Sequence, residues 1–213
     1  MIEHGFANLV VFDHPLISHK LSYLREAGTG FRSFRALMAQ VAGLMVYEVT
    51  RSFGTVGVEI ETPMERTSAR RMASQITVVP VLRAGLGMTD GILELMPEAR
   101  VGHLGMARDE RTLEPRAYLN KLPKEMDDGP VILVDPMLAT GGSAVAAIRM
   151  LRDAGAVDLR MICLVASPEG VKRLADETPD IMIYAAALDD RLDENSYICP
   201  GLGDAGDRLF GTV

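Results

Sequence analysis

The sequence has little cysteine, little basic charge and no long apolar run. Its two cysteines, Cys163 and Cys199, show neither metal-ligand spacing nor the pattern of a disulfide framework, so we expect reduced thiols. No apolar run approaches the roughly 20 residues that a membrane-spanning helix needs, and no secretory signal is recognisable at the start. We therefore expect a soluble, cytoplasmic protein without a membrane partner.

The excess of acidic over basic residues also limits the kinds of partner that the protein can bind. The chain has 22 Lys and Arg against 29 Asp and Glu, which gives a formal net charge of −7. Because nucleic acids and anionic membranes attract basic surfaces, we expect no nucleic-acid partner, and any affinity for phosphate must be local. With 213 residues, 48% of them hydrophobic, the chain can bury one full core, and we interpret residues 1–213 as a single domain.

Short apolar runs rich in β-branched residues alternate with helical patterns along most of the chain. This alternation predicts an α/β fold with a mostly parallel twisted sheet flanked by helices. The predicted strands are residues 76–82, 101–106, 131–134, 159–165 and 181–187. The predicted helices are residues 34–50, 86–95 and 143–154, and one more that begins after Ser167, where Ser-Pro-Glu supplies a cap, a first-turn proline and an acid.

Two segments lie outside this alternation. Residues 52–63 contain a candidate strand flanked by glycine and proline, and we interpret them as a protruding β-arm used in contacts between subunits. Residues 107–122 are too polar for a core although they lie between two sheet strands, which predicts a flap over the site.

The most informative stretch is VILVDPMLATGGS, residues 131–143. Its apolar start predicts a buried strand, and Asp135 follows at the carboxyl end, where open α/β sheets bind ligands. The small residues after it can direct backbone N–H groups at a phosphate, and we expect Ser143 to cap the next helix. Asp135 would repel an adjacent phosphate, so we expect it to accept hydrogen bonds from ribose hydroxyls. The alternative is an ordinary strand-to-helix turn in which Asp135 is a solvated cap.

Two arginines suggest a diphosphate. Arg83 follows the predicted strand 76–82 and precedes a small-residue turn, where a planar guanidinium and backbone amides can approach phosphate oxygens together. Arg108 lies on the candidate flap. Each could instead be an ordinary surface charge, Arg83 paired with a carboxylate and Arg108 solvated, but together, beside a ribose-phosphate loop, they favour a diphosphate.

The carboxyl-terminal stretch, residues 197–212, is rich in glycine and also carries apolar side chains. A disordered tail is the simplest alternative, but the apolar residues would gain free energy by packing. A glycine-rich loop brings backbone N–H and C=O groups close to a flat heterocycle. Because an unpaired buried polar group costs roughly 1–3 kcal/mol, such a loop can distinguish the carbonyl edge of a pyrimidine from its amino edge.

The loop of residues 131–143 resembles the phosphoribosyl diphosphate (PRPP) motif of type I phosphoribosyltransferases. Its DPMLATGGS form, with Pro136 where most of that superfamily carries a second acid, is similar to the uracil phosphoribosyltransferase family. The resemblance continues through VPVLRAGLGM, TLEP, PEG and GLGDAGDRLFGT in the family's order. It implies the type I fold with a flap, a β-arm and a carboxyl-terminal base-binding segment at residues 188–213. The implied reaction is uracil plus PRPP giving UMP plus diphosphate, a step of pyrimidine salvage.

The resemblance also implies roles for residues. Catalytic roles fall to Arg83, Arg108, Asp135 and Asp204. Arg83, Arg108 and Asp204 would face the diphosphate of PRPP, and its ribose and 5-phosphate would contact Asp135, Pro136, Met137, Leu138, Ala139, Thr140, Gly141, Gly142 and Ser143. Uracil would contact Ile198, Gly203, Asp204 and Ala205, largely through main chain.

The family also implies Mg²⁺, held mostly by substrate oxygens with Asp204 as the protein contributor, directly or through water. It implies a homodimer or a larger homo-oligomer. Relatives include forms activated by GTP and forms that are not, and no motif here decides whether GTP is an effector. Ala107 departs from the tyrosine that many relatives carry before the flap arginine, which affects the packing of the flap.

Two other functions stay open at this stage. One is a regulatory protein that senses PRPP without catalysis and acts on a nucleic acid or a protein. The acidic balance and the presence of Arg83, Arg108 and Asp204 weigh against it. The other is an enzyme of the same fold for a purine base, which the PGLGDAGD segment opposes through resemblance alone.

Overall fold

The computed structural model describes residues 5–108 and 115–212, and its centre is a nine-stranded sheet. The strand order is β1-β11-β10-β8-β4-β6-β7, with β5 beside β4 and β9 beside β10. Neighbouring strands run parallel, except that β6 and β7 are antiparallel. The strands are β1 (Leu9–Val11), β4 (Thr77–Leu82), β5 (Arg100–Val101), β6 (His103–Arg108), β7 (Pro115–Lys121), β8 (Val131–Val134), β9 (Met137–Leu138), β10 (Leu159–Ala166) and β11 (Met182–Leu188).

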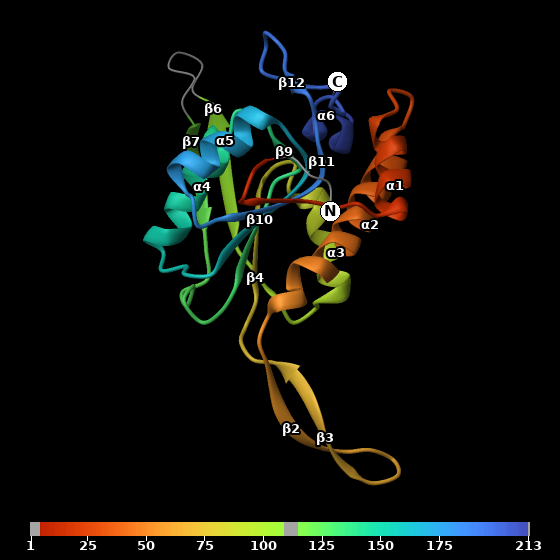
Figure 1. Cartoon of the computed structure of the whole chain (residues 1–213), viewed down its shortest axis with the longest axis vertical. Coiled ribbons are helices and arrows are strands. Elements are labelled where there is room, and N and C mark those ends of the chain that lie inside the picture. The colour runs from red at the N-terminus through yellow and green to blue at the C-terminus, as the bar shows by residue number, and fades with distance from the viewer. Residues whose placement is uncertain (1–4, 109–114, 213) are drawn as a thin grey trace.

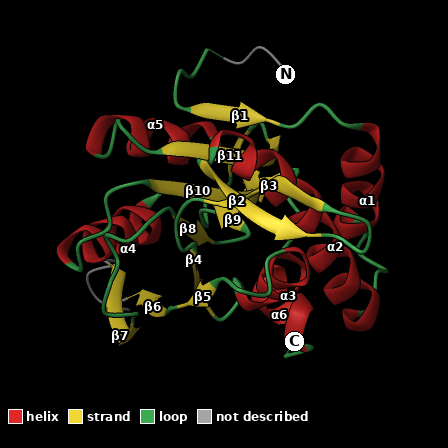
Figure 2. Cartoon of the chain, turned by 90° about the horizontal axis from the view of Figure 1, so that it is seen from below, coloured by secondary structure: helices red, strands yellow, loops and turns green. Residues whose placement is uncertain are grey.

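Helices cover both faces of this sheet, which confirms the predicted fold class (Figure 2). One face carries α1 (Pro15–Arg25), α2 (Phe31–Val49) and α3 (Leu86–Leu95), and the other carries α4 (Gly142–Asp153) and α5 (Pro168–Glu177). Val78 and Ile132 pack into the cluster that α1, α2 and α3 share, whereas Val79 and Leu133 pack against α4 and α5. Because alternate residues are buried on opposite faces, β4 and β8 appear in the sequence as unbroken apolar runs.

Helix α1 is an element that the sequence patterns did not predict. It begins at Pro15, a favoured first-turn position for proline, and the Nδ1 atom of His14 accepts a hydrogen bond from the Leu16 N–H at 3.2 Å. Its buried residues, Ile17, Leu21 and Leu24, follow the spacing of one helical face. The short 3-10 helix η1 (Thr50–Ser52) then extends the end of α2.

A long hairpin projects away from the sheet (Figure 1). It consists of β2 (Thr55–Glu61) and β3 (Arg66–Met72), which pair antiparallel with each other and with no further strand among the described residues. The segment interpreted as an arm, residues 52–63, therefore covers only the first strand of the hairpin. Most side chains of the hairpin are exposed, which explains why β3 carries no apolar pattern.

In the segment interpreted as a flap, residues 107–122, the described residues are largely extended. Strand β6 runs to Arg108 and β7 returns beside it, with a register shift between Gly105 and Met106. The remaining part of this segment, residues 109–114, lies outside the described residues.

After β11 the chain forms a small cover that we term the hood, residues 189–212. It contains the two-stranded pair β12 (Arg191–Leu192) and β13 (Ile198–Cys199) and the helix α6 (Ala205–Phe210). Figure 1 shows β9, β12 and α6 at the end of the molecule opposite the arm. Within the described residues, none of the helices combines the length and the apolar character needed to span a membrane.

Candidate active site

The predicted phosphate, ribose and diphosphate residues meet at one edge of the sheet. Strands β4, β6 and β8 are parallel neighbours, so their carboxyl ends lie at the same edge. Arg83 follows β4, Arg108 ends β6 and Asp135 follows β8. This edge is where ligands of open α/β sheets bind. For Arg108 only the backbone position, opposite Pro115, is described.

The loop between β9 and α4 presents a set of free backbone donors. In the described part of the chain, the N–H groups of Thr140, Gly141, Gly142 and Ser143 make no hydrogen bond. Four such donors at the start of a twelve-residue helix suit an anion, because the helix dipole adds to their partial charges. The first N–H groups of any helix lack intrahelical partners, so it is the position of this loop shortly after Asp135, with small residues that leave the N–H groups accessible, that favours a ligand site over an ordinary strand-to-helix turn.

The expected cap at Ser143 is wrong. The helix begins one residue earlier, its N-cap is Gly141, and no side chain bonds to the cap. Gly141 has a φ of 76°, the left-handed region that favours glycine, so backbone geometry turns the chain into the helix without a serine cap. The exposed Ser143 side chain is therefore available to a ligand.

The start of helix α5 packs against this loop. The Ser167 hydroxyl donates to the Ala139 carbonyl at 2.6 Å and accepts from the Gly170 N–H at 3.0 Å. A Cβ atom on Gly170 would lie 2.4 Å from the Ala139 carbonyl oxygen, so only glycine fits there. Sequence reasoning used Ser167 only as a helix start; the PEG motif was the signal that this turn also supports the site.

Asp135 lies half-buried at the end of β8. Its Oδ1 atom accepts a hydrogen bond from the Met137 N–H at 3.2 Å. Burial raises the pKa of Asp135 from 3.8 to about 7, and the Met137 hydrogen bond opposes this rise by stabilising the carboxylate. Burial, and secondarily the charge of Asp135, raise the pKa of the Cys163 thiol, which therefore stays protonated. A carboxyl group near its pKa at neutral pH gains charge readily when hydroxyl donors approach.

Arg83 connects the sheet edge to the hood. Its Nη2 atom lies 3.5 Å from Asp207 Oδ1, and its guanidinium lies 5.5 Å from the centre of the Phe210 ring. The side chain is 56% exposed, so this long ion pair contributes little and leaves the guanidinium free for a ligand. The turn beside it is tightly packed, since a Cβ on Gly85 would lie 2.6 Å from the Val134 carbonyl oxygen.

The predicted base-binding residues all lie in the hood. Gly203, with a φ of 78°, precedes Asp204, whose Oδ1 atom accepts from the Asp207 N–H at 2.9 Å and caps α6. Among the described residues, neither the backbone of Gly203 nor the N–H of Ala205 makes a hydrogen bond. The Ile198 side chain is buried in the core, so only its main chain can contact a base.

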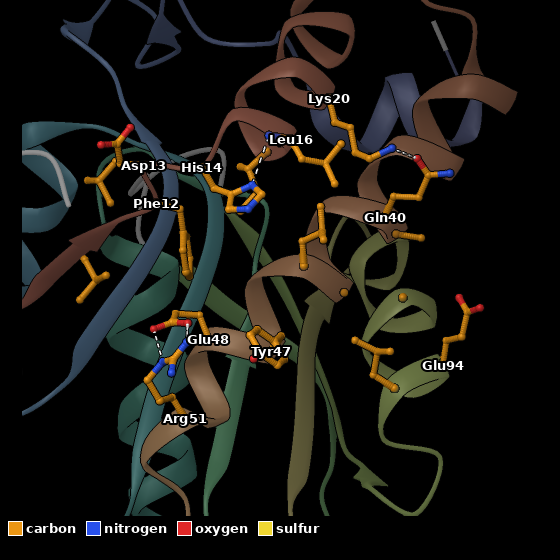
Figure 3. A pocket seen from close by; sticks show the side chains of 18 residues that line it. Phe12, Asp13, His14, Leu16, Lys20, Gln40, Tyr47, Glu48, Arg51 and Glu94 are labelled. Atoms are coloured by element: carbon orange, nitrogen blue, oxygen red, sulfur yellow. Dashed lines mark hydrogen bonds and ion pairs between the residues drawn. The ribbon is translucent and has the colours of Figure 1, made fainter.

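A separate cavity of 770 Å³ lies between β1 and the helices α1, α2 and α3 (Figure 3). Its walls are mainly apolar. Its lysine and its arginine are both engaged, because Lys20 donates to Gln40 and Arg51 pairs with Glu48. None of the residues predicted to bind PRPP or uracil lines it, so we do not assign it to the reaction.

Comparisons with known proteins agree with this geometry. A family model described as uracil phosphoribosyltransferase matches residues 10–212. The uracil phosphoribosyltransferase of Staphylococcus epidermidis is 56% identical over 203 residues, which cover 95% of this chain and 97% of that protein. The solved AQ2163 protein of Aquifex aeolicus has a TM-score of 0.91 and 35% identity, covering 95% of this chain and 97% of its own.

A more distant structure shows the shared fold alone. A hypoxanthine-guanine phosphoribosyltransferase of Bacillus anthracis has a TM-score of 0.51 at 12% identity and covers 72% of this chain and 78% of its own. The family match, in contrast, spans nearly the whole sequence and includes the sheet edge, the glycine loop and the hood. This chain therefore belongs to the uracil phosphoribosyltransferase family.

Proposed function

We propose that this chain is a pentosyl transferase that joins uracil to the ribose of PRPP, giving UMP and diphosphate. The observation that carries the proposal is the arrangement at the sheet edge, where four free N–H groups at the start of α4 adjoin Asp135. Arg83 lies at the neighbouring strand end, and the hood supplies further free main-chain groups nearby. One edge thus holds partners suited to a phosphate, a ribose, a diphosphate and a base.

PRPP would bind across this edge. Its 5-phosphate would accept hydrogen bonds from the N–H groups of residues 140–143, and its ribose hydroxyls would donate to Asp135. Arg83 would face the diphosphate with guanidinium donors whose planar geometry matches phosphate oxygens. We assign Arg108 to the same group from its place at the end of β6.

Uracil would be read by main chain in the hood. The N–H groups of Gly203 and Ala205 can donate to uracil carbonyl oxygens, and the backbone at Ile198 lies in the adjacent strand β13. Cytosine carries an amino group in place of one carbonyl, so a donor aimed at that position would face another donor. Such a mismatch leaves buried polar groups unpaired.

The donor set fits a magnesium ion that the substrate largely holds. The described residues contain no group of three or more His, Cys, Asp or Glu side chains able to hold a metal by themselves. Asp204 is an exposed carboxylate at the hood, and one of its oxygens is used in capping α6. Mg²⁺ prefers oxygen ligands and retains waters, so Asp204 would meet it directly or through water. When bound, the ion would neutralise charge on the diphosphate.

The reaction needs a stabilised leaving group and an aligned base. The bond between the anomeric carbon and the diphosphate oxygen breaks ahead of attack, and its electron pair leaves with the diphosphate. Uracil N1 then bonds to the anomeric carbon and loses its proton. Arg83 and Arg108 would provide positive charge for the leaving group, while the hood would orient uracil. Departure of the N1 proton depends on the acidity of uracil itself.

Diphosphate release from PRPP and Mg²⁺ tests the proposal, with uracil, cytosine, hypoxanthine and orotate assayed in parallel. We expect turnover with uracil alone. Turnover with hypoxanthine would identify a purine enzyme, and tight PRPP binding without turnover on any base would identify a sensor. Adding GTP to the uracil assay tests whether it is an effector, which a rise in velocity would establish.

We also propose that the chain forms a homodimer through the arm and the surface around the 770 Å³ cavity. Leu16, Tyr47 and Leu95 line that cavity and are 41%, 70% and 56% exposed, which is unusual for large apolar side chains grouped together. An isolated two-stranded hairpin is also marginal in water, so the arm would gain stability against a partner.

A further inference from the structure

The turn that leads into the proposed base site is held by a buried ion pair. Asp189 follows β11, and its backbone N–H donates to the Ala166 carbonyl at 2.8 Å, so its position is fixed by the carboxyl end of β10. The Asp189 side chain is 4% exposed and accepts from two nitrogens of Arg25, at 2.8 and 2.5 Å. Arg25 is the last residue of α1, 164 positions earlier in the chain.

Both members of the pair also bind one glycine. The Gly201 N–H donates to Asp189 Oδ2 at 2.7 Å, and Arg25 Nη1 donates to the Gly201 carbonyl at 2.7 Å. Gly201 has a φ of 63°, and a Cβ on it would lie 2.0 Å from the Ile198 carbonyl oxygen. The pair thus satisfies both backbone groups of a residue that lies between Ile198 and Gly203. We term Arg25, Asp189 and Gly201 the hood clamp.

Other contacts attach the hood to the body independently of this clamp. Arg208 donates to the carbonyls of Leu24, Leu202 and Glu26 and stacks over the Phe34 ring at 4.4 Å. Arg35 donates to the Leu209 carbonyl at 2.7 Å. These contacts secure α6 and reach the turn, residues 198–203, only at Leu202, so the distinctive effect of the clamp is on Gly201 and the main chain beside it.

We propose that Arg25 and Asp189 are positioning residues that fix the main chain reading uracil and so set the preference for uracil over cytosine. The inference rests on the base site proposed above. If main-chain N–H and C=O groups recognise uracil, recognition depends on where the backbone places them, because these groups cannot change rotamer as a side chain can. The clamp transfers the rigidity of the β10 and β11 ends, and of α1, to that turn. A loosened turn would lose selectivity before it lost the ability to hold PRPP, whose proposed loop lies on β9 and α4.

The test uses Arg25→Lys and Asp189→Asn in the full-length chain. Lysine keeps the charge but lacks the planar fork, and asparagine keeps the shape but replaces one acceptor with a donor. A displacement near 1 Å can cost about 100-fold, so we expect the KM for uracil to rise by about 10- to 100-fold. The ratio of uracil to cytosine affinity, with cytosine measured as a competitive inhibitor, should fall with it, while the Kd for PRPP measured without uracil stays within about twofold. Arg152→Lys and Asp180→Asn, which alter an exposed ion pair elsewhere, are matched controls.

The double variant Arg25→Lys with Asp189→Asn should raise the KM for uracil no further than the larger single effect, because one clamp is broken in each case. An unchanged uracil KM in both single variants would overturn the proposal. An equal rise in the Kd for PRPP would also overturn it, since it would show general loosening. If Asp189→Asn fails to fold, Arg25→Lys alone decides between these outcomes, because the Arg25 side chain is 25% exposed and its replacement disturbs the core less.

A parallel variant separates this proposal from the base site on which it rests. Gly203→Val would strain the main chain that should contact uracil, because a β-branched residue disfavours the φ of 78° found there. If Gly203→Val raises the KM for uracil and the clamp variants do not, the clamp proposal fails and the base site stands. If neither changes uracil binding, the base site itself is wrong.

Discussion

At the scale of single residues, burial and hydrogen bonding at the sheet edge set the protonation and the contacts of two acidic side chains. Asp135 is the clearest case, because burial raises its pKa to about 7 while ribose hydroxyls would favour its ionised form. Asp204 has two roles, since one carboxylate caps α6 and is also proposed to face the diphosphate. These two acids lead to separate predictions.

The affinity for PRPP should depend on pH through Asp135. In the free protein the group is largely protonated below about pH 7 and ionised above it. Because hydroxyl donors bind the ionised form, PRPP should bind more tightly as pH rises, by about tenfold per unit below the pKa, and level off above it. Calorimetric titration between pH 5.5 and 8.5 measures this. Asp135→Asn removes the titrating group, so any pH dependence of the PRPP affinity that remains in this variant comes from PRPP itself. An equal pH dependence in the variant and the parent chain would contradict the assignment.

Asp204→Asn separates charge from structure. Asparagine is as good an N-cap as aspartate, so the bond to the Asp207 N–H and the start of α6 should persist. Loss of the charge should lower kcat by about 10- to 100-fold, the usual cost of a lost metal-orienting group, with a smaller change in uracil binding. Steady-state kinetics over a range of Mg²⁺ concentrations test this. Unchanged turnover would remove Asp204 from the mechanism.

At the scale of elements, the sequence predicts what local pattern encodes and misses what distant contacts decide. The strand Val131–Val134 was predicted with its observed bounds, because a strand buried on both faces is an apolar run. Strand β3, Arg66–Met72, was missed because its exposed side chains follow no pattern. The Ser143 cap was wrong because Gly141 makes the turn with backbone alone. The Arg25–Asp189 pair joins residues 164 positions apart, which no local pattern reveals.

The contact between α5 and the phosphate loop leads to a prediction at this scale. In Gly170→Ala, the new Cβ would lie 2.4 Å from the Ala139 carbonyl oxygen and 2.8 Å from that of Leu138, so the loop must move. We expect the KM for PRPP to rise by about tenfold or more, because the free N–H groups lose their alignment. Uracil KM should change little.

A matched control for Gly170→Ala is Gly28→Ala. A Cβ on Gly28 would meet no atom within 4 Å and its backbone needs no positive φ, so the kinetics should stay as in the parent chain. Equal kinetics in both variants would show that the packing of Gly170 does not hold the loop.

At the scale of the whole molecule, the two ends serve different purposes. The sheet edge, the glycine loop and the hood lie together at one end, and the arm extends from the other (Figure 1). The cavity bordered by α1, α2 and α3 (Figure 3) is mainly apolar, and none of the residues proposed to bind PRPP or uracil lines it. The arm and that surface together carry several exposed large apolar side chains, among them Val56, Met64 and Tyr47. Burying them would lower the free energy of the molecule, and a second copy of the chain offers such a surface.

Shortening the arm tests whether it serves assembly. Thr55 and Met72 are paired across the hairpin, so an Asn-Gly turn inserted between them would replace the intervening residues without breaking the chain's register. Sedimentation velocity should show a dimer for the full chain and a monomer for the shortened one at the same micromolar concentration. Tyr47→Asp, at a side chain 70% exposed beside the cavity, should weaken the dimer without disturbing the core, because a charge opposes burial of that surface. A monomeric full chain, or a shortened chain that remains dimeric, would refute the assignment of the arm. A shortened chain that is monomeric yet still binds PRPP would show that the sheet edge forms within one copy, as its contributing strands suggest.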